Sequence, residues 1–280
     1  MGALDGRIAI VTGASRGIGK GCALELGAAG ALVYLTGRSV AEGQAPLPGT
    51  LGATAAEIEA CGGRAVAVPC DHRDDAQVEA LFERVRREHG RLDVLVNNAF
   101  LIPPELVSGL PFWRTPVSNW DDMIDVGLRS AYVASRCAAL LMVPRRAGLI
   151  VNISSSGAVE YAWHVAYGVG KAGLDRLTAD TAHELREHGV AVVSLWPGLV
   201  RTERVESWRA RLPSLDVDAA ESPRFSGRAV AALAADPGIL ARSGRALAAR
   251  DLALAYGFRD VDGRLPAGPL HGRPRGHSAA

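Results

Sequence analysis

A tyrosine and a lysine four residues apart are the side chains in this sequence best suited to transferring a proton. Tyr167 and Lys171 lie in a segment of helical period, and their spacing places both on one helix face, one turn apart. An ammonium ion about 4 Å from a phenol would stabilise the phenolate by up to ~4 kcal/mol. That would bring the phenol pKa from about 10 down to about 7, where a proton-transfer group is most useful. The pair therefore predicts acid–base chemistry, with Lys171 lowering the pKa of Tyr167.

Three glycines close the first apolar run and open the first helical segment. Residues 12–19 read Thr-Gly-Ala-Ser-Arg-Gly-Ile-Gly. Gly13 permits a tight turn, Gly17 lets the backbone approach a pyrophosphate closely, and Gly19 allows the helix to pack on the sheet. Because the motif lies at a strand-to-helix junction, it predicts a dinucleotide site.

The end of the second apolar run should choose between nicotinamide cofactors. A carboxylate there would hold the ribose diol of NAD, whereas a basic residue would accept the 2′-phosphate of NADP. The sequence has Gly37 and Arg38 at this place and no carboxylate, and Arg16 in the glycine loop offers a second guanidinium. These arginines favour NADP(H), with NAD(H) as the alternative.

Seven short apolar runs alternate with longer helical segments, which is typical of a parallel sheet covered by helices. We expect an α/β fold with a single doubly wound parallel sheet of about seven strands and helices on both faces, a Rossmann fold. This domain is expected over residues 1–265, followed by a disordered tail at 266–280. Strands are expected at 8–12, 32–36, 65–69, 92–97, 148–153, 190–195 and 244–248, and helices at 17–29, 53–61, 75–88, 120–142, 166–187 and 226–235.

Three long loops interrupt this pattern, at 39–52, 100–119 and 201–225. Ligands bind beside the carboxyl ends of the strands in such sheets, so a substrate role for these loops competes with surface decoration. Five apolar residues in or near them are candidates for a substrate pocket or for ordinary packing: Phe112, Trp113, Trp163, Trp208 and Leu212.

Charge and cysteine usage exclude several classes of protein. The chain of 280 residues has 31 Lys and Arg against 30 Asp and Glu, a net charge of +1, which argues against a nucleic-acid partner. Four scattered cysteines indicate reduced thiols and a cytoplasmic location. The longest apolar stretches are too short for a membrane span or contain Arg136, and no secretory signal is visible. We expect no membrane association and no metal site.

The motifs, taken in order, resemble the short-chain dehydrogenase/reductase family over residues 5 to about 262. Beside the glycine loop and the tyrosine–lysine pair, the resemblance rests on Asp71 after the third strand, the Asn97-Asn98-Ala99 run and the Asn152-Ile153-Ser154-Ser155 run. Pro197-Gly198 and Thr202 follow the sixth strand, where the family contacts the nicotinamide side of the cofactor.

The resemblance implies a role for each matching residue. Tyr167 would be the acid or base on the substrate oxygen, Lys171 would lower its pKa and hydrogen-bond the nicotinamide ribose, and Ser155 would bind the substrate carbonyl. Asp71 would meet the adenine. The implied cofactor contacts are Gly13, Ser15, Arg16, Gly17, Ile18, Gly19, Arg38, Asp71, Asn98, Ala99, Tyr167, Lys171, Pro197, Gly198, Val200 and Thr202.

Three positions are ambiguous or depart from the family pattern. Counting from the strand selects Ser155 as the site serine, whereas counting back from the tyrosine selects Ser154. We take Ser155, because a strand end is better fixed than a loop, and successive strand residues point to opposite faces. Gly127 occupies the position of the family's fourth catalytic residue, an asparagine, and Phe100 replaces a glycine after the Asn-Asn-Ala run.

The resulting interpretation is an oxidoreductase that transfers a hydride between NADP(H) and a carbonyl or secondary alcohol, of carbonyl reductase type. The alternatives are an NAD-dependent dehydrogenase of the same family, or a nucleotide-binding, redox-sensing module weakened in catalysis by Gly127. The expected partners are a small carbonyl or alcohol substrate and further copies of the chain, as a homodimer or homotetramer.

Overall fold

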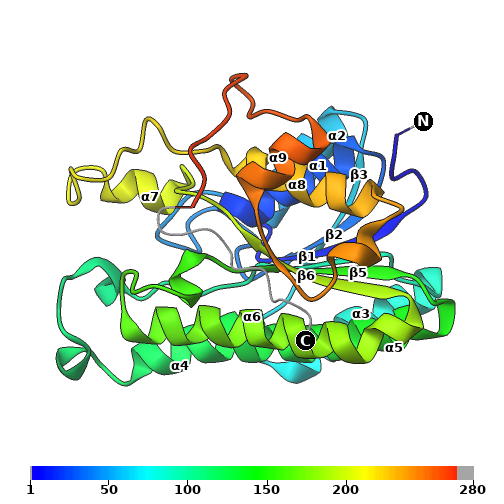
Figure 1. Ribbon diagram of the computed structural model, residues 1–280, viewed down its shortest axis with the longest axis horizontal. Coiled ribbons are helices and arrows are strands. Elements are labelled where there is room, and N and C mark those ends of the chain that lie inside the picture. Colours follow the sequence, from blue (N-terminus) through cyan, green and yellow to red (C-terminus); the bar gives the residue numbers. More distant parts are fainter. Residues whose placement is uncertain (1, 270–280) are drawn as a thin grey trace.

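Seven parallel strands form one sheet in the order β3-β2-β1-β4-β5-β6-β7 (Figure 1). The computed structural model describes residues 2–269. The order reverses between β1 and β4, which is where ligands bind at the carboxyl ends in folds of this kind. The expected sheet is confirmed. The strands are β1 Ile8–Thr12, β2 Leu32–Gly37, β3 Arg64–Pro69, β4 Val94–Asn97, β5 Gly148–Ile153, β6 Val190–Trp196 and β7 Ala246–Ala248.

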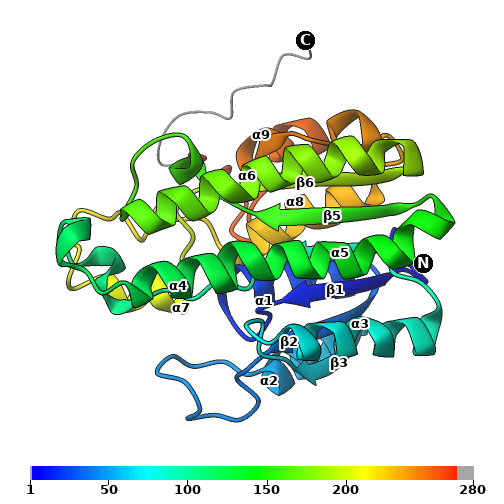
Figure 2. The ribbon, with the colours of Figure 1, turned by 90° about the horizontal axis from the view of Figure 1, so that it is seen from below.

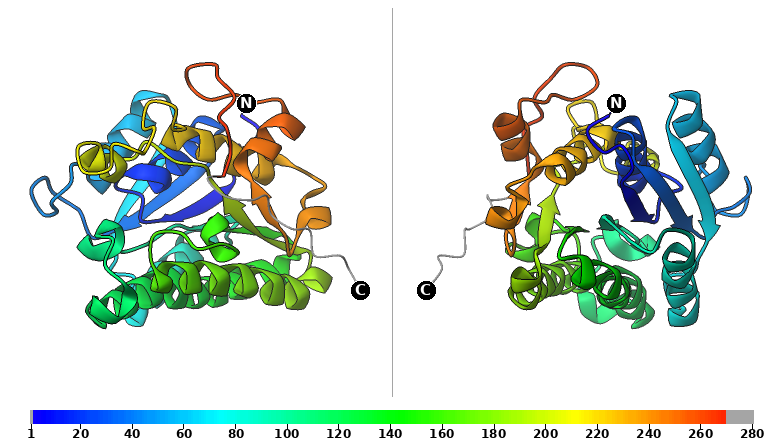
Figure 3. Two further views of the ribbon diagram at one scale, coloured as in Figure 1. Left: turned by 60° about the vertical axis from the view of Figure 1, so that its left-hand side comes forward. Right: turned by 90° about the vertical axis from the view of Figure 1, so that its right-hand side faces the viewer.

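Helices cover both faces of the sheet (Figures 1 and 3). Strand residues alternate between two apolar cores: Ala9 and Val11 of β1 face one, Ile8 and Ile10 the other. One layer holds α1 Gly17–Ala28, α2 Leu51–Ala60, α8 Pro223–Ala235 and α9 Ala249–Tyr256. The other holds α3 Asp75–His89, α4 Ser118–Ile124, α5 Ser130–Met142 and α6 Val165–Leu185, seen face-on in Figure 2.

Helix boundaries follow local capping chemistry. Thr50 begins α2 by accepting a hydrogen bond from the backbone N–H of Ala53, and Asp74 begins α3 in the same way. Gly90, with φ of 65°, ends α3 in the left-handed region that glycine adopts without strain.

The segment expected as one helix at 120–142 is divided. A π-helical turn at Asp125–Arg129 separates α4 from α5. Gly127 lies in this turn, and a β-carbon there would come within 2.6 Å of the Phe100 ring. The apolar residues keep a helical period through this segment, so their pattern could not show the interruption.

Helices α1 and α8 pack at unusually close range, although about 200 residues separate them. A β-carbon on Gly21 would come within 2.0 Å of the Pro223 carbonyl oxygen, and one on Gly227 within 2.2 Å of the Gly21 carbonyl oxygen. Arg224 also forms an ion pair with Glu25 across the same contact, at 2.6 Å. Only glycine at these two positions lets the backbones meet.

Two short helices were not predicted. The segment 201–225, expected to be a polar loop, contains α7 Glu203–Trp208, and α9 follows β7 directly. The loop before α2 projects from the side of the molecule that carries β2 and β3 (Figure 2). The predicted tail at 266–280 lies mostly outside the described residues.

One helical stretch of the described chain, Ser118–Arg145, is long and apolar enough to cross a membrane. However, 61% of its most apolar window is buried within the protein. Within this stretch, α5 packs against β4 and β5 in the core.

Candidate active site

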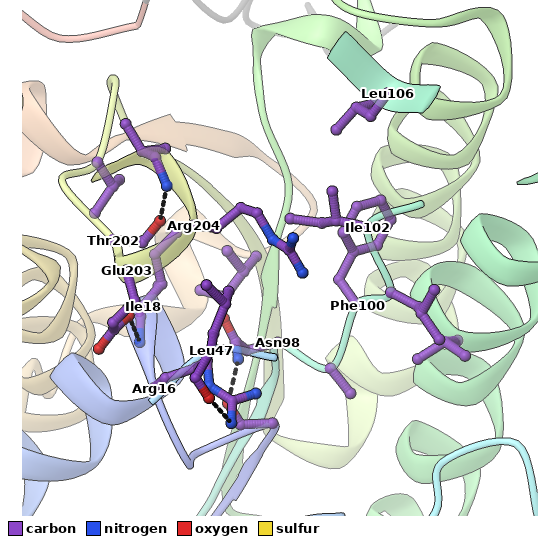
Figure 4. Close-up of a pocket in the computed structure, with 18 of the residues that line it drawn as sticks. Arg16, Ile18, Leu47, Asn98, Phe100, Ile102, Leu106, Thr202, Glu203 and Arg204 are labelled. Carbon is purple, nitrogen blue, oxygen red and sulfur yellow. Dashed lines mark hydrogen bonds between the residues drawn. The ribbon is translucent and has the colours of Figure 1, made fainter. Parts of the chain in front are cut away.

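A cavity of about 770 Å³ lies at the carboxyl ends of the strands. It extends from the glycine loop after β1, past the loop after β4, to α6 and α7. Every predicted site residue except Gly19 lines it. Figure 4 shows side chains that enter it from the glycine loop, the loop after β4 and α7. Gly19 packs behind the loop instead, since a β-carbon there would lie 2.3 Å from the Gly13 carbonyl oxygen.

Tyr167 and Ser155 form a hydrogen-bonded pair inside the cavity. The Tyr167 hydroxyl donates to Ser155 Oγ at 2.9 Å, and the backbone N–H of Gly157 donates to the same oxygen at 3.2 Å. Gly157 has no side chain, and a β-carbon there would lie 2.7 Å from the tyrosine ring. Ser154 is buried and donates to the Lys171 carbonyl oxygen at 3.3 Å. The hydroxyl beside the tyrosine therefore belongs to Ser155.

Lys171 is buried at the base of the same site. Its Nζ donates to the Ile153 carbonyl oxygen at 2.9 Å and lies 4.6 Å from the centre of the Phe100 ring. Burial lowers its pKa to about 8, against the opposing influence of Asp175. Phe100 thus covers the lysine with an aromatic face, to which a cation is attracted.

The predicted lowering of the Tyr167 pKa is wrong. Burial raises the pKa of this phenol above its ordinary value, and the hydrogen bond with Ser155 offsets only part of that effect. The Lys171 ammonium, which was expected to act as the nearby charge, is engaged by the Ile153 carbonyl instead. The spacing of Tyr167 and Lys171 predicted that both lie on one helix face. It could not predict the direction of the ammonium group or the burial of the tyrosine ring.

The glycine loop is held in place by the run after β4. Thr12 Oγ1 accepts hydrogen bonds from the backbone N–H groups of Asn98 and Ala99, at 2.8 and 2.9 Å. The Asn98 amide returns bonds to the carbonyl oxygens of Thr12 and Gly13. Gly13 and Gly17 have φ of 66° and 56°, a region that favours glycine. The loop therefore keeps its shape through its own contacts.

Arg16 and Arg38 both line the cavity but differ in their contacts. The Arg16 guanidinium donates to Ser39 Oγ at 2.9 Å. Its remaining bonds go to backbone carbonyl oxygens of the projecting loop, those of Leu47, Pro48 and Gly49. Arg38 is exposed and lies 3.9 Å from the Asp71 carboxylate. Arg16 thus orders the loop after β2, whereas Arg38 presents a freer guanidinium.

Sequence reasoning missed Glu203, the first residue of α7. Its carboxylate accepts a hydrogen bond from the Gly17 backbone N–H at 2.9 Å, at the N-terminus of α1 where a pyrophosphate was predicted. Thr202 begins α7 by accepting from the Val205 N–H at 3.2 Å. A threonine followed by acidic residues in the first turn, here Glu203 and Glu206, is a helix-start signal that could have revealed this helix.

The far wall of the cavity is apolar. Phe100, Ile102 and Leu106 line one side. Trp163, in the loop before α6, and Trp208, the last residue of α7, line the other, with ring centres 6.0 Å apart. Of the five apolar candidates, only these two tryptophans line the cavity. Leu212 packs behind it, and Phe112 and Trp113 are 58% and 72% exposed.

The comparisons with known proteins agree with this geometry. A sequence model of the short chain dehydrogenase family matches residues 7–213. The chain is 50% identical to mouse dehydrogenase/reductase SDR family member 1, covering 93% of this chain and 85% of that protein, and 48% identical to the human protein over the same shares. The crystal structure of a metagenomic short-chain oxidoreductase in complex with NADP is 36% identical, with a TM-score of 0.68 over 84% of this chain and 92% of its own. This chain belongs to the short-chain dehydrogenase/reductase family of oxidoreductases.

Proposed function

We propose that the protein is an NADP(H)-dependent carbonyl reductase that also runs in reverse as a secondary alcohol dehydrogenase. The observation that carries this proposal is the hydrogen bond between Tyr167 and Ser155 in a cavity whose other end is the glycine loop. A proton-transfer group and a nucleotide cradle in one space suit hydride chemistry on a carbonyl.

The residues present fit a nicotinamide dinucleotide. Gly13 and Gly17 adopt a left-handed φ that disfavours a side chain, and both line the cavity at the α1 N-terminus. The Gly17 N–H there donates to the Glu203 carboxylate, so a bound pyrophosphate would take the place of that carboxylate. Arg38 and Ser39 lie at the end of β2, where a 2′-phosphate would be held, and Pro197, Gly198 and Thr202 line the opposite end. The bound cofactor would supply or accept the hydride.

The raised pKa of Tyr167 suits the reductive direction. A phenol with a pKa above its ordinary value keeps its proton at neutral pH, so Tyr167 acts as a general acid toward the substrate carbonyl oxygen. Ser155 Oγ, held by the Gly157 N–H, orients that oxygen. The Lys171 ammonium places a positive charge beneath the site, and this favours the negative charge that develops on the oxygen.

The presence of glycine at 127, where the family has an asparagine, favours the second candidate, a nucleotide-binding module with weakened catalysis. The π-helical turn at Asp125–Arg129 keeps the helix interrupted without an asparagine. Phe100 takes the space that a side chain at 127 would need. The intact contact between Tyr167 and Ser155 favours the enzyme.

Tyr167→Phe separates the two candidates. In steady-state assays over a broad panel of ketones and aldehydes, we expect kcat to fall by roughly 10²- to 10⁴-fold, because the general acid is removed. The Kd for NADPH, measured by fluorescence titration, should stay within about twofold, since the ring remains.

Two adjacent serines provide a matched pair of controls. Ser155→Ala should lower kcat much more than Ser154→Ala, because only Ser155 contacts the tyrosine. NADPH binding without turnover on any carbonyl of the panel, unchanged by Tyr167→Phe, would establish the binding module instead.

We also propose a homodimer or homotetramer in the cytoplasm. Support for self-association comes from the outward faces of α5 and α6, where Tyr132, Leu140 and Val169 are exposed. The cytoplasmic location rests on the reduced cysteines alone.

A further inference from the structure

Three arginines line the cavity, and they differ in what they bind. Arg16 is held by the loop after β2, and Arg38 faces Asp71. Arg204, the second residue of α7, has a guanidinium with no hydrogen bond or ion pair to any residue between 2 and 269. Its neighbour Glu203 cannot neutralise it, because that carboxylate is directed at the Gly17 N–H.

The surroundings of Arg204 make an unpaired cation costly. The residue is partly buried, and loss of water lowers its pKa. The nearby charge of Arg16 is also positive, and each guanidinium disfavours the other. A half-buried charge without a partner is unfavourable unless a ligand supplies one.

The guanidinium extends across the cavity toward the apolar wall. Figure 4 shows the Arg204 side chain leaving α7 and reaching toward Phe100 and Ile102. The Phe100 ring lies edge-on to the Tyr167 ring, with centres 5.9 Å apart. A molecule whose carbonyl lies at Tyr167 and whose body lies on this wall therefore passes beneath Arg204.

We propose that Arg204 determines substrate specificity by binding an anionic group, so that the substrate is an apolar carbonyl compound with a carboxylate remote from the reacting carbon. This inference rests on the proposed reductase function and names its substrate class. Apolar contacts hold the body of such a molecule, and a charge-assisted hydrogen bond from the guanidinium fixes its far end.

The test compares acids with their neutral amides. Wild-type protein should reduce 3- or 4-acetylbenzoate with a kcat/KM on the order of 10- to 100-fold above that of the matching acetylbenzamide, the range for a hydrogen bond to a charged group. In Arg204→Gln this ratio should fall to about one, and Arg204→Lys should keep part of it. Arg204→Glu should instead prefer 4-acetylbenzylamine, whose ammonium reverses the charge.

A matched control removes the same charge from the same segment. Arg201 lies three residues earlier, is exposed and does not line the cavity. Arg201→Gln should keep the wild-type preference for the acid.

Binding measured without turnover keeps this inference separate from the reductase proposal. Calorimetric titration of 4-acetylbenzoate and 4-acetylbenzamide, with and without NADP⁺, requires no reduction. Tighter binding of the acid, lost in Arg204→Gln, supports the inference even if no ketone is reduced, an outcome that contradicts the proposed function alone.

Equal binding of acid and amide by wild-type protein overturns the inference and leaves the reductase proposal standing. The inference also fails if Arg204→Gln raises the KM for NADPH by the same factor as it lowers the acid preference. The guanidinium would then bind the phosphates of the cofactor.

Discussion

The two ends of the cavity differ in how their polar groups are satisfied. At the nucleotide end, the Arg16 guanidinium and the Gly17 N–H already bond to oxygens of the chain, and Thr12 fixes the loop after β4. At the substrate end, the Arg204 guanidinium has no partner among residues 2–269 and faces an apolar wall. The first end holds its shape without a ligand, whereas the second leaves one charge for a ligand to neutralise. The nucleotide end, which would bind the cofactor, is therefore held by contacts within the chain, and the substrate end keeps a charged group available to bind a substrate.

The two ends also differ in how deeply their titratable side chains are buried. Lys171 and Tyr167 are both shifted toward their neutral forms by loss of water. Arg38, at the nucleotide end, is exposed and keeps its hydration. Changes at the substrate end should thus alter chemistry and stability, and changes at the nucleotide end should alter cofactor affinity.

Arg38→Asp tests this division with the largest expected effect. The KM for NADPH should rise roughly 10- to 100-fold, because a charge-assisted contact is replaced by repulsion. The KM for NADH should fall, while kcat changes little. Steady-state kinetics with both cofactors measures this.

Arg64→Asp is the matched control for that variant. Arg64 begins β3 at the opposite end of the sheet, is exposed and does not line the cavity. An unaltered NADPH affinity in Arg38→Asp would instead support the NAD-dependent alternative.

Gly127→Ala probes how tightly the substrate end is packed. Its β-carbon would meet the Phe100 ring at 2.6 Å, so we expect a loss of about 1–3 kcal/mol in the free energy of unfolding. Phe100→Ala in the same chain should recover much of this loss. Urea denaturation of the single and double variants measures the coupling between the two sites.

Gly52→Ala is the matched control, because nothing lies within 4 Å of a β-carbon there and the residue is helical. It should be neutral or stabilising by up to about 1 kcal/mol. Equal effects of the two substitutions would show that the Phe100 contact does not constrain residue 127.

Glu221→Gln extends the comparison to a buried acid behind the Pro197–Gly198 turn, with the smallest expected effect. Burial raises the pKa of Glu221 to about 8, so the folded protein binds a proton that the unfolded chain has released between about pH 4.5 and 8. The contribution of Glu221 to the free energy of unfolding is therefore fully present below pH 4.5 and is lost as the pH rises to about 8. The variant should remove that loss, gaining on the order of 1 kcal/mol at pH 8 after weaker hydrogen bonding by the amide is included.

Thermal unfolding at pH 5 and pH 8 measures the change, with the exposed Glu59→Gln as control. If the difference in Tm between the two pH values is the same in wild type and Glu221→Gln, then Glu221 does not titrate in this range.

Local sequence patterns predicted the strands of the sheet and the residues that line the site. The features that they did not predict depend on contacts between residues far apart in the sequence. The strands at 8–12 and 148–153 were predicted with their observed bounds, because both faces of each are buried and the apolar runs are continuous. The lack of space for a side chain at Gly127 comes from Phe100, and the partner of the Gly17 N–H is Glu203, 186 residues away. The raised Tyr167 pKa depends on burial, which the spacing from Lys171 does not encode.

The close packing of α1 against α8 has a consequence for how the protein is made. During synthesis, α1 leaves the ribosome about 200 residues before α8, yet the backbone at Gly21 of α1 packs directly on that of residues 223 and 224. Until those residues emerge, Gly21 and Gly27 leave that helix weakly stabilised, since glycine is a poor helix former. Such distant contacts are slow to form. The nucleotide end should therefore be among the last parts of the fold to become ordered, although its sequence is translated first.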